Sequence, residues 1–425
     1  MESPAHMHLA HANLLIWTIA ALAAAGVVIR PFRLPEAVWA VGGAALVTAF
    51  GLLPLSEAIA GVAKGLDVYL FLFGMMLLSE IGRREGLFDA VAAFAVNHAG
   101  GSPRRLFLLI YAAGTVITVL MSNDAAAVVL TPAVFAAAKR AKTDPLPHLF
   151  ACALIANAAS FVLPISNPAN LVLYAGQMPP LAQWLASFAL PSAAAILTTF
   201  VALRWVERDR LAGPCECEVE QPRLTRGGWT AVAGLGATIV VLLSVSALDQ
   251  PLGLPTAIMG ALTMAVVCLT SRTSPAPILK GVSWLVLALV AGLFVLVEAL
   301  AKTGVIAALG STLAQASQAN AASAAWSAGG LLALACNLLN NLPAGLMASA
   351  AAAQAHAPRG VVDALLIGVD LGPNLSVTGS LATILWLAAI RREGEDVGFW
   401  RFLKVGVVVT PPALILALGA RMLTG

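Results

Sequence analysis

The chain is built around uninterrupted apolar runs of about 17 residues or more, each long enough to cross the roughly 30 Å hydrocarbon core of a bilayer. These runs recur from one end of the 425 residues to the other. Only 11% of the residues are charged, compared with about a quarter in an average soluble domain. The sequence therefore predicts an all-α polytopic membrane protein. Full spans are expected near 13–30, 36–53, 66–81, 147–175, 183–204, 228–247, 254–271, 282–300, 360–390 and 403–422.

Two further apolar stretches, 105–138 and 324–355, are interrupted by polar residues. The first contains Ser122-Asn123-Asp124 and the second contains Asn340-Asn341. Each arm has about 16 residues, and as a helix it reaches roughly 24 Å, past the midplane but short of a full crossing. Lipid cannot satisfy a polar tip at that depth, whereas a protein-lined cavity can. We therefore predict two re-entrant hairpins with their tips inside the protein.

The lysines and arginines distinguish the two faces of the predicted protein. If the amino terminus lies outside, 20 of the 24 fall on the cytoplasmic face, and only Lys64, Lys302, Arg359 and Arg421 fall on the outer face. Cytoplasmic loops of membrane proteins carry such an excess of Lys and Arg. The distribution predicts a multi-pass protein of the inner (plasma) membrane with its amino terminus outside.

An internal repeat relates 64–176 to 280–389. In both, a span ending in glutamate is followed by an amphipathic connector, an interrupted hairpin and a broken helix. One offset pairs Gly74, Glu80, Arg84, Gly86 and Asn123 with Gly292, Glu298, Lys302, Gly304 and Asn341. A second offset pairs Asn157, Ser160, Asn167 and Asn170 with Asp370, Pro373, Ser380 and Thr383.

Each half contains five predicted spans, an odd number, so the second half enters the membrane from the opposite side. We expect a first repeat over 1–206, a cytoplasmic linker over 207–227 and a second repeat over 228–425. Each repeat contains a re-entrant hairpin and a discontinuous helix. Inverted repeats of this kind are typical of secondary transporters, which bind substrate near the midplane between the halves.

Four polar stretches interrupt the apolar background: the two hairpin tips and two segments at 164–170 and 370–383 that contain Pro and Gly. Broken helices present backbone donors and acceptors at their ends. The alternative is that such residues only hold helices together, and for any single Ser or Thr we favour that role. Taken together, the set predicts substrate-binding residues, namely Ser122, Asn123, Asn167, Asn170, Asn340, Asn341, Asn374, Thr378 and Ser380.

Two carboxyl groups, those of Asp124 and Asp370, are placed near the bilayer centre by this assignment. Ionisable residues at that depth are costly and are functional by default. We predict that they carry the coupling proton, and the sequence leaves open which of them does so. The alternative is a structural carboxylate that caps a half-helix. Asp67 and Asp363 are expected at the membrane interface.

Several classes of protein are excluded by missing motifs. No Walker-type run, HExxH run, nucleophile elbow or dinucleotide fingerprint occurs, so no enzymatic activity and no cofactor are expected. No basic stripe with interleaved aromatics suggests nucleic-acid binding. We predict no metal site, since Cys215 and Cys217 form only a lone CxC pair.

The polar motifs resemble those of the arsenite permease (ArsB) family of the ion-transporter superfamily. The resemblance covers essentially the whole chain and is carried by Ser122-Asn123-Asp124 with Leu130-Thr131-Pro132, by Asn340-Asn341-Leu342-Pro343, and above all by the segment from Gly368 to Trp386. It implies export of trivalent arsenic and antimony, as neutral hydroxides, in exchange for protons. It also implies an elevator-like transport unit that slides against a scaffold, and in some members an attached cytoplasmic ATPase.

The sequence departs from this pattern in its second polar element, where Pro164-Ile165-Ser166-Asn167-Pro168 contains an extra proline. Sodium-coupled relatives have Ser-Asn-Thr at their tips, whereas aspartate replaces threonine at the first tip here, which favours protons. Two alternatives remain: a sodium-coupled importer of a dicarboxylate or inorganic anion, and the membrane subunit of an ATP-driven arsenite pump.

Overall fold

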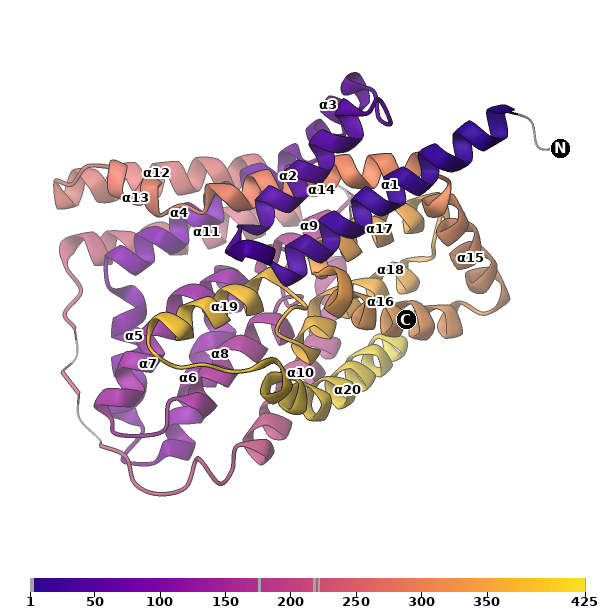
Figure 1. The fold of residues 1–425 in the computed structure, drawn as a ribbon. Helices are drawn as coiled ribbons and strands as arrows, with labels where there is room; N and C mark the ends of the chain where they lie inside the picture. Colours follow the sequence, from indigo (N-terminus) through magenta and orange to yellow (C-terminus); the bar gives the residue numbers. More distant parts are fainter. Residues whose placement is uncertain (1–3, 175–176, 217–218, 221, 425) are drawn as a thin grey trace.

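The computed structural model describes residues 4–174, 177–216, 219–220 and 222–424, and throughout this part the chain forms helices joined by turns and short loops, without a strand (Figure 1). Eight helices within it are long and apolar enough to cross a membrane. A ninth span is obtained if α3 (Leu55–Lys64) and α4 (Leu66–Arg84), which meet at a 50° bend, are counted together. The prediction of an all-α polytopic membrane protein is thus confirmed.

The helices form two groups that pack mainly within themselves. The first group, here called the frame, lies along the upper side of Figure 1 and includes α3 and α4. Its other members are α1 (Pro4–Ile29), the short turn η1 (Pro31–Arg33), α2 (Glu36–Ala49), α11 (Arg226–Ala247), α12 (Gly253–Ser271), α13 (Ala276–Gly281) and α14 (Trp284–Lys302).

Two glycines that the sequence pairs with each other lie at close helix crossings of the frame. A Cβ on Gly74 of α4 would lie 2.3 Å from the backbone oxygen of Thr256 on α12. A Cβ on Gly292 of α14 would lie 2.7 Å from the backbone of Ala40 on α2. Small residues let membrane helices approach this closely. Both glycines thus lie where two helices of the frame touch, and their pairing by an inverted repeat stays a prediction.

The second group, here called the inner bundle, contains the two interrupted stretches. The first is α6 (Pro103–Leu120), a π-helical turn η2 (Ala125–Leu130) and α7 (Thr131–Arg140). The second is α16 (Ala321–Leu339) and α17 (Asn341–Gln354). The prediction of short, equal arms is wrong, because α6 and α16 have 18 and 19 residues and are each long enough to cross a membrane. The chain turns back at the predicted polar tips, and only the returning arms are short.

The inner bundle also contains the two discontinuous helices, which break where Pro and Gly predicted. The first comprises α8 (Leu146–Ala158), the short turn η3 (Pro164–Ser166) and α9 (Pro168–Tyr174). The second comprises α18 (Arg359–Leu371), the turn η4 (Gly372–Leu375) and α19 (Leu381–Arg392). Two long helices, α10 (Leu181–Val206) and α20 (Phe399–Leu423), pack against each other and complete the bundle.

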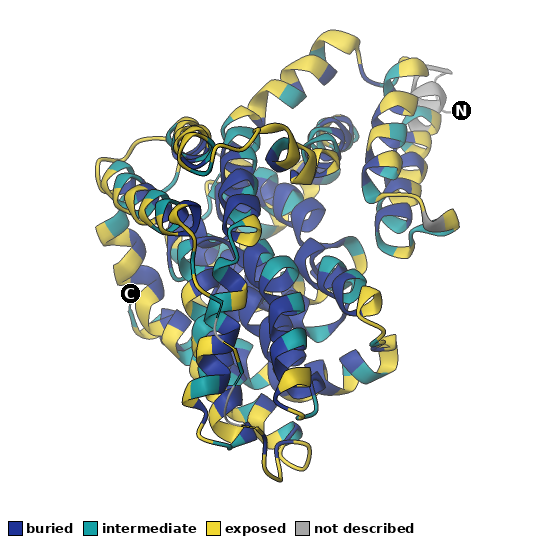
Figure 2. Ribbon diagram, turned by 90° about the vertical axis from the view of Figure 1, so that its left-hand side faces the viewer, coloured by how far each residue is buried: buried dark blue, intermediate teal, exposed yellow. Residues whose placement is uncertain are grey.

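Helix α8 forms the centre of this bundle. All 13 of its residues are buried, as expected of a helix that is apolar on every side. Figure 2 shows how burial varies across the molecule, with buried residues on the central helices and exposed residues on the outward faces. Because α8 is enclosed by protein on all sides, the break that follows it is shielded from lipid.

Two amphipathic connectors occupy equivalent places in the two halves. Helix α5 (Leu87–His98) follows Gly86, and α15 (Val305–Ala319) follows Gly304. Both glycines have positive φ, 73° and 83°, which a glycine adopts without steric cost. The connectors lie at opposite ends of the molecule, α5 at the left and α15 at the right of Figure 1. This is the arrangement expected of two halves that run in opposite directions.

The predicted linker is held against the end of the molecule that contains α5 and α7. The Glu216 amide donates to the Ala141 carbonyl (2.9 Å), and the Asn97 side chain pairs with the backbone of Val219 at 2.9 and 3.0 Å. Arg210 forms an ion pair with Asp144 (2.9 Å). The linker is therefore part of the folded surface.

One aspartate has partners that the sequence did not reveal. Asp363, expected at the membrane interface, is fully buried in α18. Its carboxylate accepts hydrogen bonds from Arg421 of α20 (2.8 Å) and from the Tyr174 hydroxyl at the end of α9. The hydropathy pattern could not reveal this, because Arg421 lies 58 residues away near the carboxyl terminus.

Candidate functional site

The hairpin tips, the discontinuous helices and the frame meet at one small cavity of about 20 Å³, room for about one water molecule. The frame contributes Leu72 of α4 and Val286 of α14. The inner bundle contributes Asn123, Asp124, Asn167, Pro168, Asn341, Leu342, Leu381 and Ala382. Four predicted site residues, Asn123, Asp124, Asn167 and Asn341, therefore converge.

The first hairpin tip is built on unusual backbone. Ser122, between α6 and the π-helical turn, has φ of 145°, a value that residues other than glycine rarely adopt. Such conformations persist where surrounding contacts impose them, often at functional sites. The turn directs Asn123 and Asp124 to the cavity. Ser122 itself lines the open vestibule described below.

The second tip reaches the cavity in a related way. Asn340 has φ of 72°, and its side chain accepts from the Leu342 amide (3.4 Å) at the start of α17. The Asn341 amide donates to the Gly379 carbonyl (2.9 Å), which attaches the tip to the second discontinuous helix. Asn341 then lines the cavity opposite Asn123. The side-chain oxygens of Asn123 and Asn341 have no hydrogen-bond partner among the described residues.

Hydrogen bonds between the two discontinuous helices join them into one unit. Asn157 Nδ2 donates to Asn374 Oδ1 (3.0 Å), and Asn374 Nδ2 donates to the Leu154 carbonyl (2.9 Å). Asn167 Nδ2 donates to Asp370 Oδ1 (2.7 Å). All of these side chains are buried. Buried side chains beside the two breaks thus connect one discontinuous helix to the other.

The remaining predicted residues are bonded within the protein and do not line the cavity. Asn170 Nδ2 donates to the Ser160 carbonyl (3.0 Å), which the break leaves without a helical partner. Ser380 accepts from the Thr383 amide (3.1 Å) and caps α19. Thr378 donates to the Asn337 carbonyl (3.2 Å) and lines a different cleft. In this conformation Asn170, Asn340, Asn374, Thr378 and Ser380 hold the site together.

The two predicted coupling residues have different surroundings. Asp124 lines both the cavity and the vestibule and makes no side-chain hydrogen bond with any described residue. Asp370 is fully buried behind Asn167 and lines neither the cavity nor the vestibule. Only Asp124 is placed to meet a solute directly.

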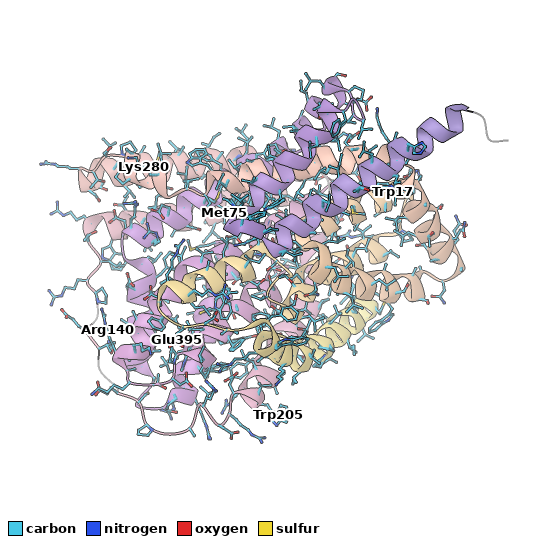
Figure 3. All side chains as sticks on the ribbon, in the orientation of Figure 1. Trp17, Met75, Arg140, Trp205, Lys280 and Glu395 are labelled. Carbon is cyan, nitrogen blue, oxygen red and sulfur yellow. The ribbon has the colours of Figure 1, made fainter. Side chains whose placement is uncertain are left out.

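A vestibule of about 500 Å³ leads from the cavity to one end of the molecule. Met75, Ser79 and Arg83 line it along α4, and Gly281 lines it at its mouth. In Figure 3, Met75 lies near the middle of the molecule, whereas Lys280, next to Gly281, lies at the left-hand end, as does Arg140. The vestibule therefore opens toward the basic end, which the charge distribution assigns to the cytoplasm.

A second open cleft of about 1020 Å³ lies between the frame and the inner bundle. Its lining includes Asp67 at the start of α4, Tyr174 at the end of α9 and Arg359 at the start of α18. Asp67 also accepts from the Gly253 amide (2.8 Å), which caps α12. Helix α4 thus runs from this cleft, at Asp67, to the vestibule, at Arg83. The buried part of α9 separates the cleft from the cavity.

Sequence reasoning missed some residues that position the site. Asn337 on α16 donates to the Gly372 carbonyl (3.1 Å) and accepts from Ser376 (2.7 Å), which fastens the second break. Trp386 on α19 donates to the Leu149 carbonyl of α8 (2.9 Å). Asn337 lies three residues before Asn340 in the sequence, and this closeness to the polar tip could have identified it as a residue of the site. Trp386 ends the segment that carries the family resemblance, but nothing in the sequence indicated its bond to Leu149.

Among the described residues, no three His, Cys, Asp or Glu side chains come close enough to hold a metal ion. Cys217 lies outside the described residues, so the pairing of Cys215 with Cys217 is untested.

Span-forming helices, two discontinuous helices joined at a buried polar cavity and a vestibule leading to it define a multi-pass membrane secondary transporter. Residues 14–371 match the family model described as citrate transporter (CitMHS). The chain belongs to this family.

Similar curated proteins include an uncharacterized transporter of Mycobacterium tuberculosis (strain H37Rv), 25% identical over 93% of this chain and 95% of that protein. An arsenical pump membrane protein of Escherichia coli is 26% identical over 81% of this chain and 83% of that protein. The similarity to arsenical pump membrane proteins is therefore distant, and the family that the chain matches is that of the citrate transporters.

Two solved structures share the fold. The YdaH transporter of Alcanivorax borkumensis superposes with a TM-score of 0.56 at 16% identity, covering 97% of each chain. Neisseria gonorrhoeae MtrF, described as illuminating a class of antimetabolite efflux pumps, gives 0.55 at 14% identity over 89% of this chain and 85% of that one. At identities this low, the similarity to the two structures establishes a shared fold and nothing about function.

Proposed function

We propose that this chain exports arsenite and antimonite, as neutral trihydroxides, from the cytoplasm in exchange for protons. The observation that carries the proposal is the convergence of Asn123, Asp124 and Asn341 on one cavity. A trihydroxide presents O–H donors, and carboxylate and amide oxygens accept them. The similarity to arsenical pump membrane proteins supports this choice of substrate.

The charges around the cavity favour a neutral solute over an anion. None of the described residues that line it is Lys or Arg, and Asp124 contributes a carboxyl group. A citrate or dicarboxylate ion at this place would meet like charge in a site of low dielectric, which is unfavourable. The cavity holds about one water molecule, so a larger solute enters only when the surrounding elements move apart.

In the proposed cycle, Asp124 binds either a proton or the solute. A trihydroxide enters from the cytoplasm through the vestibule and donates hydrogen bonds to the ionised Asp124 and to the two asparagine oxygens. After the inner bundle has moved relative to the frame, a proton from outside binds Asp124, neutralises it so that it accepts hydrogen bonds more weakly, and releases the solute. The proton then leaves into the cytoplasm when the site returns. Asp370 acts through Asn167, which it holds in place.

Transport in everted membrane vesicles tests this proposal. With an acidic lumen, arsenite should accumulate inside vesicles that contain the protein, and a protonophore should abolish the accumulation. Vesicles without the protein provide the control. Accumulation that is the same with and without the proton gradient would contradict the coupling.

Orientation is a second part of the proposal. We propose that the protein lies in the inner membrane with its amino terminus outside, and that the repeats over 1–206 and 228–425 enter from opposite sides, joined by the linker 207–227. The opposite placement of α5 and α15 supports this. In a background without native cysteines, Arg140→Cys should react with an impermeant maleimide only from the cytoplasm and Ser311→Cys only from outside. Labelling of both from one side would contradict the inversion.

An anion importer is the alternative favoured by the family description and by Arg83 and Arg392, which line the vestibule. Sodium-dependent uptake of citrate or a dicarboxylate into right-side-out vesicles, without arsenite export, would establish it. A cytoplasmic ATPase partner is the third candidate, and the linker is the surface to test. Co-purification of an ATPase that is lost when residues 207–216 are replaced by a Gly/Ser segment would support it.

A further inference from the structure

A third cleft, of about 1190 Å³, lies between α1 of the frame and α19 of the inner bundle. It is separate from the cavity, and Thr378, which lines it, does not line the cavity. Its size matches or exceeds that of sites that hold drug-sized ligands. We propose that this cleft binds an anionic phospholipid of the cytoplasmic leaflet, with its phosphate on the arginines and its acyl chains along the apolar wall. This inference is independent of the transported solute.

Both walls of the cleft, α1 and α19, are apolar along most of their length and end in arginine. On α1, Val28 and Ile29 line the cleft and are followed at once by Arg30. Ile29 is also the last residue of the first span-forming helix. Arg30 therefore lies where this span leaves the hydrocarbon region, the depth at which a lipid phosphate sits.

Helix α19 repeats this gradient along one face. Ile384, Leu387 and Ala388 line the cleft, followed by Arg391 at the end of the helix. Spacings of three and four residues place these side chains one above another on a helix. An apolar face that ends in arginine matches an amphiphile with acyl chains at depth and an anionic group at the surface. Neither a free anion nor a purely apolar ligand would use both parts.

The charge of the lining favours an anion. Three arginines, Arg30, Arg391 and Arg392, face a single aspartate, Asp396. Arg391 pairs with Asp396 (2.7 Å) and Arg30 pairs with Glu36, whereas Arg392 is exposed and forms no ion pair with a described residue. Basic pockets between membrane helices on the cytoplasmic side bind anionic head groups in this way. A bound lipid would touch both helix groups and so favour one of their relative positions.

Native mass spectrometry of the purified full chain tests the proposal with phosphatidylglycerol and phosphatidylcholine as probes. The wild type should retain phosphatidylglycerol in preference to phosphatidylcholine. Each arginine near an anionic surface contributes about fivefold in affinity, so Arg391→Gln with Arg392→Gln should weaken phosphatidylglycerol binding by about 25-fold. Binding is the readout, because Arg392 also lines the vestibule.

Two controls keep the result interpretable. The double variant Arg140→Gln with Arg208→Gln removes the same charge from exposed positions outside the cleft and should bind as the wild type does. Leu387→Trp keeps all arginines but fills the apolar wall, and should weaken retention of the lipid. Equal binding of the two lipids, an equal loss in both double variants, or full displacement by excess inorganic phosphate would each overturn the proposal.

Discussion

The two hairpin tips present the same residue to the cavity and then differ. Asn123 and Asn341 are paired by the predicted repeat, both line the cavity, and each has a side-chain oxygen without a partner among the described residues. The next residue is Asp124 in the first half and Leu342 in the second, and both of these also line the cavity. The second half instead has its carboxyl group at Asp370, buried behind Asn167. The two tips thus share an asparagine that lines the cavity and differ at the next residue, which makes the first tip chemically distinct.

The largest effect on transport is expected when Asp124, the residue that distinguishes the two tips, loses its carboxyl group. Asp124→Asn should lower proton-driven arsenite flux by about 100-fold, because Asp124 contributes the only carboxyl group among the described residues that line the cavity. The flux is measured in everted vesicles at equal protein content. Asp209→Asn, at an exposed position of the linker, is the control and should leave the flux unchanged. Retention of wild-type flux and pH dependence by Asp124→Asn would remove Asp124 from the mechanism.

A second prediction concerns the places where the two halves are alike. Gly74→Val and Gly292→Val should each lower the free energy of unfolding by about 1–3 kcal/mol, because each forces apart a close crossing of two helices. Thermal unfolding in detergent measures this loss. Gly42→Val, where nothing lies within 4 Å of the added Cβ, is the matched control. Destabilisation at only one of the paired glycines would show that their packing is not equivalent.

Asp370→Asn should have a smaller effect on transport than Asp124→Asn. An amide at position 370 can still accept from Asn167, so the flux should fall by less than about tenfold and keep its dependence on pH. A pH profile of arsenite flux distinguishes a positioning residue from the proton carrier. If Asp370→Asn abolishes the pH dependence and Asp124→Asn does not, the two roles are exchanged.

The smallest effects should be those of the paired asparagines. Asn123→Ala and Asn341→Ala each remove one hydrogen bond to the solute, so each should raise the KM for arsenite by about 2- to 10-fold with little change in maximal rate. Asn320→Ala, which removes an exposed helix cap, is the control. Unequal values for the two tips would show that the solute binds nearer to one of them.

Much of the fold could be predicted from the sequence because each apolar run carries its own evidence of length and hydropathy. The breaks at Pro164 and Gly372 were visible for the same reason, since Pro and Gly act locally. The lengths of α6 and α16 were misjudged because the two stretches were taken to begin at 105 and 324, although Pro103 and Ala321 begin the helices.

The site was only partly predictable. The sequence identified which polar residues are buried, but it could not separate those that face the cavity from those that bond within the protein. Asn167 and Asn170 occur in one motif, yet the first lines the cavity and the second satisfies a broken helix. The partners are distant in the sequence: Asn167 bonds to Asp370 in the other half, and Asp363 is buried against Arg421, 58 residues further along the chain.

The bonds between the discontinuous helices also constrain how the protein is made. Asn157 and Asn167 find their partners 217 and 203 residues later in the chain. At about 5–20 residues per second, a ribosome needs roughly 10–40 s to add those residues. During that time the broken first helix has polar groups that lipid cannot satisfy. The first half must therefore remain beside the insertion machinery, or in contact with water, until the second half arrives, and release into lipid is expected to wait for the whole chain.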